Sequence, residues 1–100
     1  MNKKMIQQAK KLQQDMMKMQ EELENSTVEA SSGGGAVKVV VNGKLKLESI
    51  TISEEVVDTD EIDMLSDLIL AAVNEGISKS QEEASSKMSS LTGGLNIPGF

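Results

Sequence analysis

The first quarter of the chain carries apolar residues at alternating steps of four and three. We call this line the seam, and its members are Met5, Ala9, Leu12, Met16, Met19 and Leu23. The spacing is a heptad pattern kept for about three repeats, and at about 100° per residue it places the six side chains along one side of a helix. We predict a helix from Asn2 to Glu24, within a basic amphipathic segment 1–26.

The apolar period shortens to about two residues after the polar run that ends the first helix, which indicates strands. Thr27 to Ser32 is predicted as a first strand, Gly33-Gly34-Gly35 as a turn, and Ala36 to Val41 as a second strand rich in valine. A third strand carries the chain to Ser53. Segment 27–53 is therefore predicted to be an antiparallel meander.

Asn42-Gly43 is a strong hairpin signal, because both residues tolerate positive φ at little cost. A three-residue loop ending in a left-handed Gly43 keeps the apolar residues of both strands on one face. The expected cross-strand pairs are Val39 with Leu45 and Val37 with Leu47. Further along, the apolar positions move to Ile50 and Ile52, so we predict a bulge or kink in the third strand.

A second helix is predicted over residues 60–89, with Thr59 or Asp60 as its cap. Its apolar positions recur at helical spacing and are expected to cover one sheet face: Ile62, Leu65, Leu68, Ile69, Ala72, Val73 and Ile77. The domain is thus predicted to span 1–90. The tail 91–100 contains two glycines and the only proline, and we expect it not to continue the helix. Two readings of it stay open: no fixed structure, or docking of Leu95, Ile97 and Phe100 on the body or on a partner.

Composition narrows the class of protein. The chain has 100 residues, no cysteine or histidine, and Phe100 as its only aromatic residue. Without thiols or imidazoles we assign no catalysis, no metal site and no cofactor. No apolar run is long enough for a signal peptide or a membrane span, which predicts a cytosolic protein. The seam and an open sheet would leave more apolar surface than a monomer usually keeps, so we predict a homodimer with the six seam residues in its contact and an edge strand of the sheet as a further candidate.

Charge is divided unevenly along the chain. Residues 1–20 carry about +4 and residues 21–100 about -10, for a net charge of -6. The first-helix lysines fall on the side opposite the seam: Lys3, Lys4, Lys10, Lys11 and Lys18. This surface, the lysine face, is either an ordinary solvated surface or a site for nucleic-acid phosphates. With no arginine and no aromatic ring to stack on bases, phosphate contact would read little sequence.

Other candidate sites have simpler explanations. The methionines of the first helix are suited to adaptable packing, with a promiscuous groove for partner helices as the alternative. Asp58, Asp60 and Asp63 lack the pattern and the glycine of a calcium loop, so helix capping explains them better. The three glycines at 33–35 lead into a strand rather than a helix, which favours a turn over a phosphate cradle.

The ordered set of motifs resembles the YbaB/EbfC family of nucleoid-associated proteins. The similar segments are Lys10-Lys11-Leu12-Gln13, Met19-Gln20-Glu21-Glu22-Leu23, Gly33-Gly34-Gly35-Ala36-Val37-Lys38-Val39, Asn42-Gly43-Lys44, Asp67-Leu68-Ile69-Leu70-Ala71-Ala72-Val73-Asn74 and Leu91-Thr92-Gly93-Gly94-Leu95-Asn96-Ile97-Pro98-Gly99-Phe100. The resemblance covers nearly the whole chain. It implies an α+β homodimer of α-β-β-β-α subunits, helices that project like tweezers, and DNA binding by the dimer in the cytoplasm or nucleoid.

These observations lead to two hypotheses of different class. The first is a non-enzymatic, nucleoid-associated protein that binds duplex DNA as a homodimer, largely without sequence specificity, and affects nucleoid organisation or gene expression. The second is a cytosolic adaptor or chaperone-like module whose coiled-coil arms hold another protein. A basic helix lying on anionic lipid is disfavoured by the weakly hydrophobic seam and the lack of Trp. Neither hypothesis calls for a membrane or a small-molecule substrate.

Overall fold

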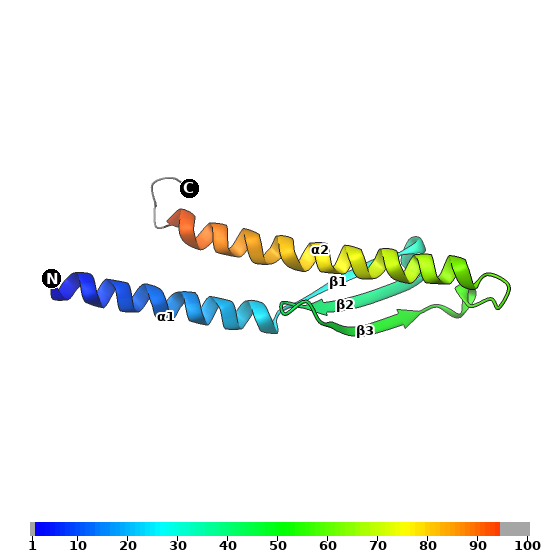
Figure 1. Ribbon diagram of the computed structural model, residues 1–100, viewed down its shortest axis with the longest axis horizontal. Helices are drawn as coiled ribbons and strands as arrows, with labels where there is room; N and C mark the ends of the chain where they lie inside the picture. Colours follow the sequence, from blue (N-terminus) through cyan, green and yellow to red (C-terminus); the bar gives the residue numbers. More distant parts are fainter. Residues whose placement is uncertain (1, 95–100) are drawn as a thin grey trace.

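The chain folds as a helix, a three-stranded antiparallel sheet and a second helix. The computed structural model describes residues 2–94, and Figure 1 shows the arrangement. The elements are α1 (Lys3–Asn25), β1 (Thr27–Ser32), β2 (Val37–Asn42), β3 (Leu47–Ile52) and α2 (Ile62–Gly94), with short 3₁₀ turns η1 (Gly33–Gly35) and η2 (Glu54–Val56). The predicted α-β-β-β-α order is confirmed.

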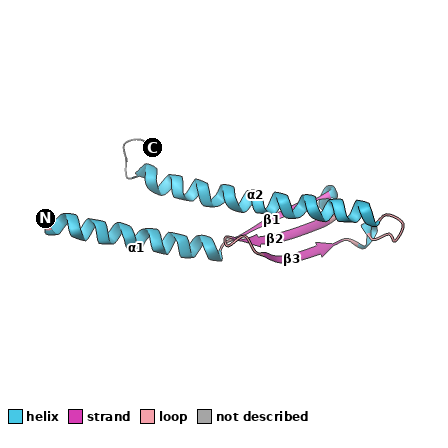
Figure 2. Cartoon of the chain, viewed as in Figure 1, coloured by secondary structure: helices cyan, strands magenta, loops and turns pink. Residues whose placement is uncertain are grey.

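The molecule is elongated, with principal extents of 71 × 24 × 16 Å. Figure 2 shows α2 lying along the sheet, while α1 and the far half of α2 extend side by side beyond it. The two ends of the described chain therefore lie at the same end of the molecule. No helix among residues 2–94 has the length and apolar character needed to cross a bilayer.

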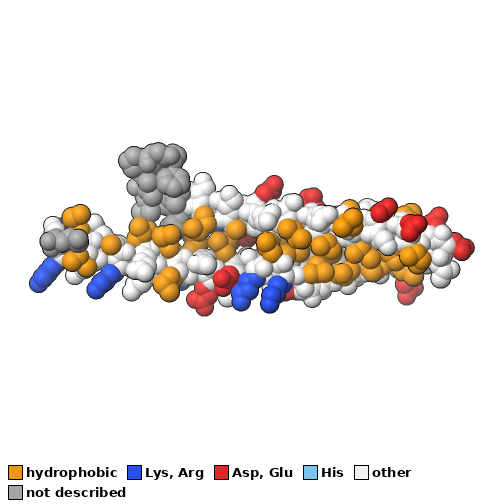
Figure 3. Space-filling model, in the orientation of Figure 1, with side chains coloured by type: hydrophobic (Ala, Val, Ile, Leu, Met, Phe, Trp, Pro, Cys, Tyr) orange, Lys and Arg blue, Asp and Glu red, His pale blue; other side chains and the backbone are white. Residues whose placement is uncertain are grey.

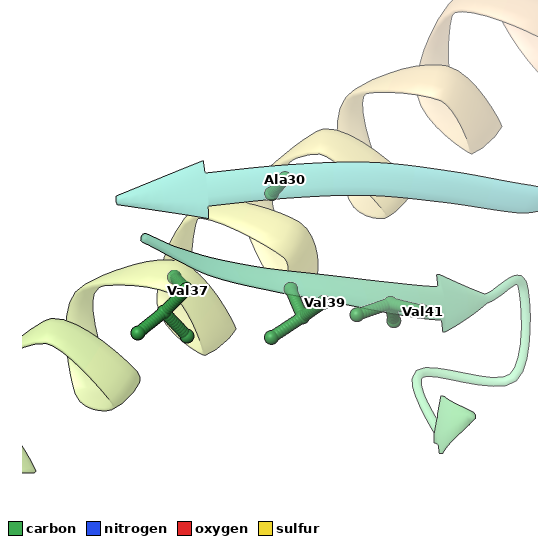
Figure 4. Close-up of a cluster of buried hydrophobic side chains, with 5 residues drawn as sticks. Ala30, Val37, Val39 and Val41 are labelled. Carbon is green, nitrogen blue, oxygen red and sulfur yellow. The ribbon is translucent and has the colours of Figure 1, made fainter. Parts of the chain in front are cut away.

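The core lies between one face of the sheet and α2. Val37, Val39 and Val41 of β2 are at most 1% exposed and pack with Ala30 of β1 and Ala72 of α2. Figure 4 shows the three valines and Ala30 gathered beside the helix. Burying such side chains contributes on the order of 2 kcal/mol each, so this small cluster holds the helix to the sheet.

Small residues on α2 allow this close approach. A Cβ added to Gly76 would lie 2.8 Å from Cγ2 of Val41, too near for an ordinary contact. One turn further on, the buried Ser80 donates its hydroxyl to the Asn42 carbonyl at 3.0 Å. At the other end of the sheet the Ser32 hydroxyl donates to the Leu68 carbonyl. Both ends of the contact are therefore fixed by hydrogen bonds to backbone carbonyls.

The predicted register of the β2–β3 hairpin is wrong. Val39 pairs with Ile50 and Val37 with Ile52, rather than with Leu45 and Leu47. Asn42 is not a loop residue but the last residue of β2, and its side-chain oxygen accepts hydrogen bonds from the amides of Lys44 and Lys46. The loop is thereby longer than expected.

Backbone conformation in the loop also differs from the expectation. The left-handed position is occupied by Leu45, at φ 61°, and not by Gly43. The predicted irregularity of the third strand is confirmed, because the pairing shifts between Val40 opposite Ser49 and Val41 opposite Leu47, which leaves Glu48 as an extra residue. The bulge returns Ile50 and Ile52 to the same face as the β2 valines.

The second helix starts and ends later than predicted. It begins at Ile62 and runs to Gly94, so the expectation that residues from 91 onward leave the helix is wrong up to that point. Two glycines at the end of a long helix are tolerated at about 1 kcal/mol each. The alternative readings for Leu95, Ile97 and Phe100 concern residues outside the described chain.

Candidate nucleic-acid interface

The α1 helix begins with a side-chain cap and ends where the chain turns into β1. The Asn2 side-chain oxygen accepts the Lys4 amide at 2.9 Å, which satisfies one of the free donors of the first turn. At the other end the hydroxyl and amide of Ser26 both donate to the Leu23 carbonyl. The helix bounds thus agree with the sequence prediction to within a residue at each end.

The attachment of α1 to the sheet is confined to its last turn. Leu23 is its only buried residue, at 8% exposure. The Gly43 amide donates to the Ser26 carbonyl at 3.0 Å, and a Cβ on Gly43 would overlap the Leu23 carbonyl oxygen. Glycine is therefore required here because two backbones meet, and the rest of α1 extends away from this junction.

The lysine face lies on this projecting part of α1. All five of its lysines are exposed, and within residues 2–94 none of them forms an ion pair. Lys3 and Lys18 are 15 residues apart, which corresponds to about 22 Å along a helix, or roughly six to seven base pairs of duplex. Figure 3 shows blue lysine side chains near the far end of α1, well separated from most of the acidic side chains.

The charges on α1 oppose the dipole of the helix. Lys3 and Lys4 stand at its amino-terminal end and the glutamates Glu21, Glu22 and Glu24 at its carboxyl-terminal end, with no acid in the first turn and no base in the last. A helix is stabilised by the reverse arrangement, by about 0.3 to 1 kcal/mol per charge. Here the positive end of the dipole adds to the field of the two lysines, which favours an anion at that end.

The seam faces the second half of α2 across a groove. Four of its residues, Ala9, Leu12, Met16 and Leu23, line this groove opposite Ala84 and Met88. Met5 is 60% exposed and Met19 is half-buried. The structure thus brings most of the predicted interface residues together on one surface, and their contact with a second copy stays a prediction.

An exposed apolar surface lies on β3, an edge strand of the sheet, and its residues were not specified from the sequence. Leu47, Ile50 and Ile52 are 41%, 42% and 37% exposed, although they share a sheet face with the buried valines of β2. The helix α2 lies over β1 and β2 and leaves the edge strand uncovered. Figure 3 shows apolar side chains in a band along this end of the molecule. These three residues can be placed opposite the β2 valines only if the register of the β2–β3 hairpin, with its bulge at Glu48, is known.

Three further exposed lysines lie outside α1. Lys44 and Lys46 stand in the β2–β3 loop, next to the junction with α1, and Lys38 is exposed on β2. On α2, in contrast, Lys87 pairs with Glu83 at 3.0 Å and Lys79 donates to the Glu29 carbonyl at 3.1 Å. Both lysines of α2 therefore already have partners within the chain, on the same helix for Lys87 and on β1 for Lys79.

One of the aspartates before α2, Asp58, hydrogen-bonds to the backbone. The Asp58 side chain accepts the Asp60 amide at 2.9 Å, which stabilises the turn that precedes the helix. Among residues 2–94 no group of three or more acidic, His or Cys side chains is placed to hold a metal ion.

Comparison with known proteins decides the family. The model of the YbaB/EbfC DNA-binding family matches residues 1–95. The chain belongs to this family. A nucleoid-associated protein of Pelotomaculum thermopropionicum is 54% identical over 97 residues, covering 97% of this chain and 92% of that protein. A nucleoid-associated protein of Syntrophobacter fumaroxidans is 56% identical over 95 residues, covering 95% and 86%.

The fold is found again in a solved structure. The crystal structure of an uncharacterized protein from Helicobacter pylori superposes with a TM-score of 0.73, covering 92% of this chain and 98% of that one. At 17% sequence identity this likeness concerns the fold alone. It shows that the extended arrangement of the YbaB/EbfC chain recurs in a distant sequence.

Proposed function

We propose that this YbaB/EbfC family member is a nucleoid-associated protein that binds duplex DNA through the lysine face of α1, largely without sequence preference and without chemistry of its own. The observation that carries the proposal is the placement of Lys3 and Lys4 at the amino-terminal end of α1. Their positive charges destabilise the helix there, because that end of the helix dipole is also positive. Five exposed lysines along one helix side, none of them in an ion pair within residues 2–94, would supply the phosphate contacts.

Binding of this kind is compatible with an acidic protein. At ordinary salt the Debye length is about 8 to 10 Å, so a charged body at the other end of a 71 Å molecule is screened from the arm. Lysine acts as a point charge on phosphate rather than as a planar reader of guanine. The expected mode is therefore weak to moderate, steeply salt-dependent and insensitive to sequence.

We further propose that the protein acts as a homodimer, which would present two lysine faces to one duplex. The uncovered apolar face of β3, formed by Leu47, Ile50 and Ile52, supports this, because such a surface beside a core is typical of an interface. The seam predicted from the sequence is the other candidate contact: Met5, Ala9, Leu12, Met16, Met19 and Leu23. A sedimentation mass equal to one chain at micromolar concentration would contradict the dimer.

The DNA site is tested by exchanging five lysines at a time. One variant carries Gln at the lysine face (Lys3, Lys4, Lys10, Lys11, Lys18), and the matched variant carries Gln at the other five (Lys38, Lys44, Lys46, Lys79, Lys87), so each has a net charge of -11 instead of -6. Gel-shift titrations on duplex DNA at about 50 and 200 mM salt give the affinity and its salt dependence.

The expected result is a loss of at least tenfold at low salt, with a flatter salt dependence, for the lysine-face variant only. Equal losses in both variants would mean that net charge rather than the lysine face governs binding. No shift of the native protein at tens of micromolar would favour the adaptor hypothesis instead.

A further inference from the structure

The arm of the molecule, formed by α1 and the far half of α2, contains an apolar groove that the DNA site does not use. Its volume is about 730 Å³, and its apolar walls come from Ala9, Leu12 and Met16 on α1 and from Ala84 and Met88 on α2. None of the ten lysines, all of which lie within residues 2–94, lines the groove. The groove is therefore a surface separate from the lysine face.

The groove leaves α1 with little packing of its own. No residue of α1 before Leu23 is buried, and Met16 and Met17 are 39% and 64% exposed. Isolated helices of this length are marginal in water, because most helical stability in proteins comes from packing of an apolar face. An apolar line kept over three heptads is typical of a helix that packs against another helix. The groove is thus suited to an amphipathic helix.

We propose that the groove receives the α1 helix of a second copy of this chain, lying antiparallel to the first. The contact is twofold symmetric, so each copy lays its α1 in the groove of the other. Four helices then meet around the seam and around Ala84 and Met88, as in a four-helix bundle. The lysine faces lie on the sides of α1 opposite the seam and stay outside the contact.

Charge on α1 selects the antiparallel direction. Residues 3–13 carry four lysines and no acid, or +4, whereas residues 15–25 carry one lysine and four acids, or -3. An antiparallel copy lays its basic half along the acidic half of the first helix, and the symmetry repeats this match at the other end. A parallel copy would lay like charges together, which disfavours that direction.

Other charges near the junction do not remove this match. The Ser80 hydroxyl donates to the Asn42 carbonyl, so the next turn of α2, with Glu82 and Glu83, lies near the end of α1. Lys44 and Lys46 stand in the neighbouring loop. These two acids and two bases offset one another, and the opposite signs of the two halves of α1 remain.

The arm contact deepens the homodimer of the proposed function, because it gives the seam a defined partner and direction. It is additional to the β3 contact and weaker, since part of its binding free energy is spent on fixing a helix that is marginal alone. We therefore expect it to appear at higher protein concentration, where it joins the arms of dimers already held through β3.

Single cysteines test the contact, because the chain has none of its own. Each is placed in the Ile50→Glu background, which removes association through β3. Gln13 lines the groove, and its neighbour Gln14 is exposed and does not. At hundreds of micromolar protein and under a mild oxidant, we expect Gln13→Cys to form disulfide-linked dimers at least tenfold faster than Gln14→Cys. Adding Met16→Glu should slow Gln13→Cys to the rate of Gln14→Cys.

Two further positions test the direction of the helices. In an antiparallel contact centred on the seam, Ala9 lies about 15 Å along the axis from Ala9 of the other copy but within about 2 Å of the level of Gln20. A disulfide needs Cα atoms within about 7 Å. Ala9→Cys and Gln20→Cys should therefore link to each other when mixed, at least tenfold faster than either links to itself.

Equal rates for Gln13→Cys and Gln14→Cys would overturn the arm contact. Rapid self-linkage of both Ala9→Cys and Gln20→Cys would overturn the antiparallel direction, because parallel helices bring every position next to its own copy. Sedimentation of the native chain reports the homodimer separately, so a native dimer with equal cysteine rates would remove the arm contact alone. No sample contains DNA, and circular dichroism verifies that each variant retains its helices.

Discussion

The sheet end and the arm of this molecule are held together by different means. At the sheet end, three valines at most 1% exposed and two serine hydroxyls that donate to backbone carbonyls fix α2 to β1 and β2. In the arm, α1 has no buried residue before Leu23, and its terminal charges oppose its own dipole. Stability thus resides in the sheet end, while the arm carries on α1 an arrangement of charges that does not serve its own stability.

The largest expected effect concerns which of the two regions holds the dimer. Ile50→Glu places a charge in the β3 apolar face, and burying an unpaired charge at both copies should weaken the dimer at least 100-fold. Leu70→Glu, on the exposed side of α2, should leave it unchanged. Sedimentation equilibrium measures both.

The seam supplies the opposing variant. Met16→Glu lies on α1, where the seam faces the groove, and should leave the dimer intact if β3 forms the contact. A monomer produced by Met16→Glu but not by Ile50→Glu would transfer the interface to the seam.

A smaller effect distinguishes the buried from the exposed apolar residues. Val39→Ala removes two methyl groups from a fully buried site and should lower the free energy of unfolding by about 2 to 3 kcal/mol. Met17→Ala, at 64% exposure in the arm, should change it by no more than about 0.5 kcal/mol. Urea unfolding followed by circular dichroism, at one fixed protein concentration, compares them. Equal losses would mean that the arm is as well packed as the sheet end.

The smallest effect separates helix stability from DNA affinity. Lys3→Glu with Lys4→Glu should stabilise α1 by about 0.5 to 1 kcal/mol, because acids favour the amino-terminal end of a helix, while DNA binding weakens. Lys10→Glu with Lys11→Glu makes the same charge change inside the helix and should weaken DNA binding without the gain. Amide hydrogen exchange of α1 and a gel shift measure the two properties. An increase in the stability of α1 in both double variants, or in neither, would reject the dipole explanation.

Local patterns predicted the helices and strands well. The heptad spacing placed α1 within a residue of its observed ends, and β1 was predicted at its observed bounds. The lysine face also followed from sequence, since opposite sides of one helix depend only on the 3.6-residue period. These features are fixed by neighbours in the chain.

Features that depend on more distant contacts were not predicted. The hairpin register was wrong because Asn42 stays in β2 and Leu45, rather than Gly43, takes the left-handed conformation. For the same reason an edge strand was a candidate contact without the residues of the β3 face being specified. The groove depends on how α1 and α2 lie relative to one another, which no local period encodes. The end of α2 was predicted too early, because the helix continues through Gly93 and Gly94.

Because α1 is attached to the sheet only at its last turn, beside Gly43, a small rotation at this junction would move the far end of the helix by a large distance. Leu23 is the buried attachment point of α1, and Lys3 lies 20 residues away, or about 30 Å along the helix. A rotation of α1 by about 10° about Leu23 would displace Lys3 by about 5 Å, more than the roughly 3.4 Å rise of one base pair, while the sheet stays unchanged. In the proposed mode of DNA binding, the angle between α1 and the sheet would set which phosphates the lysine face reaches, without any change in the positions of the core valines.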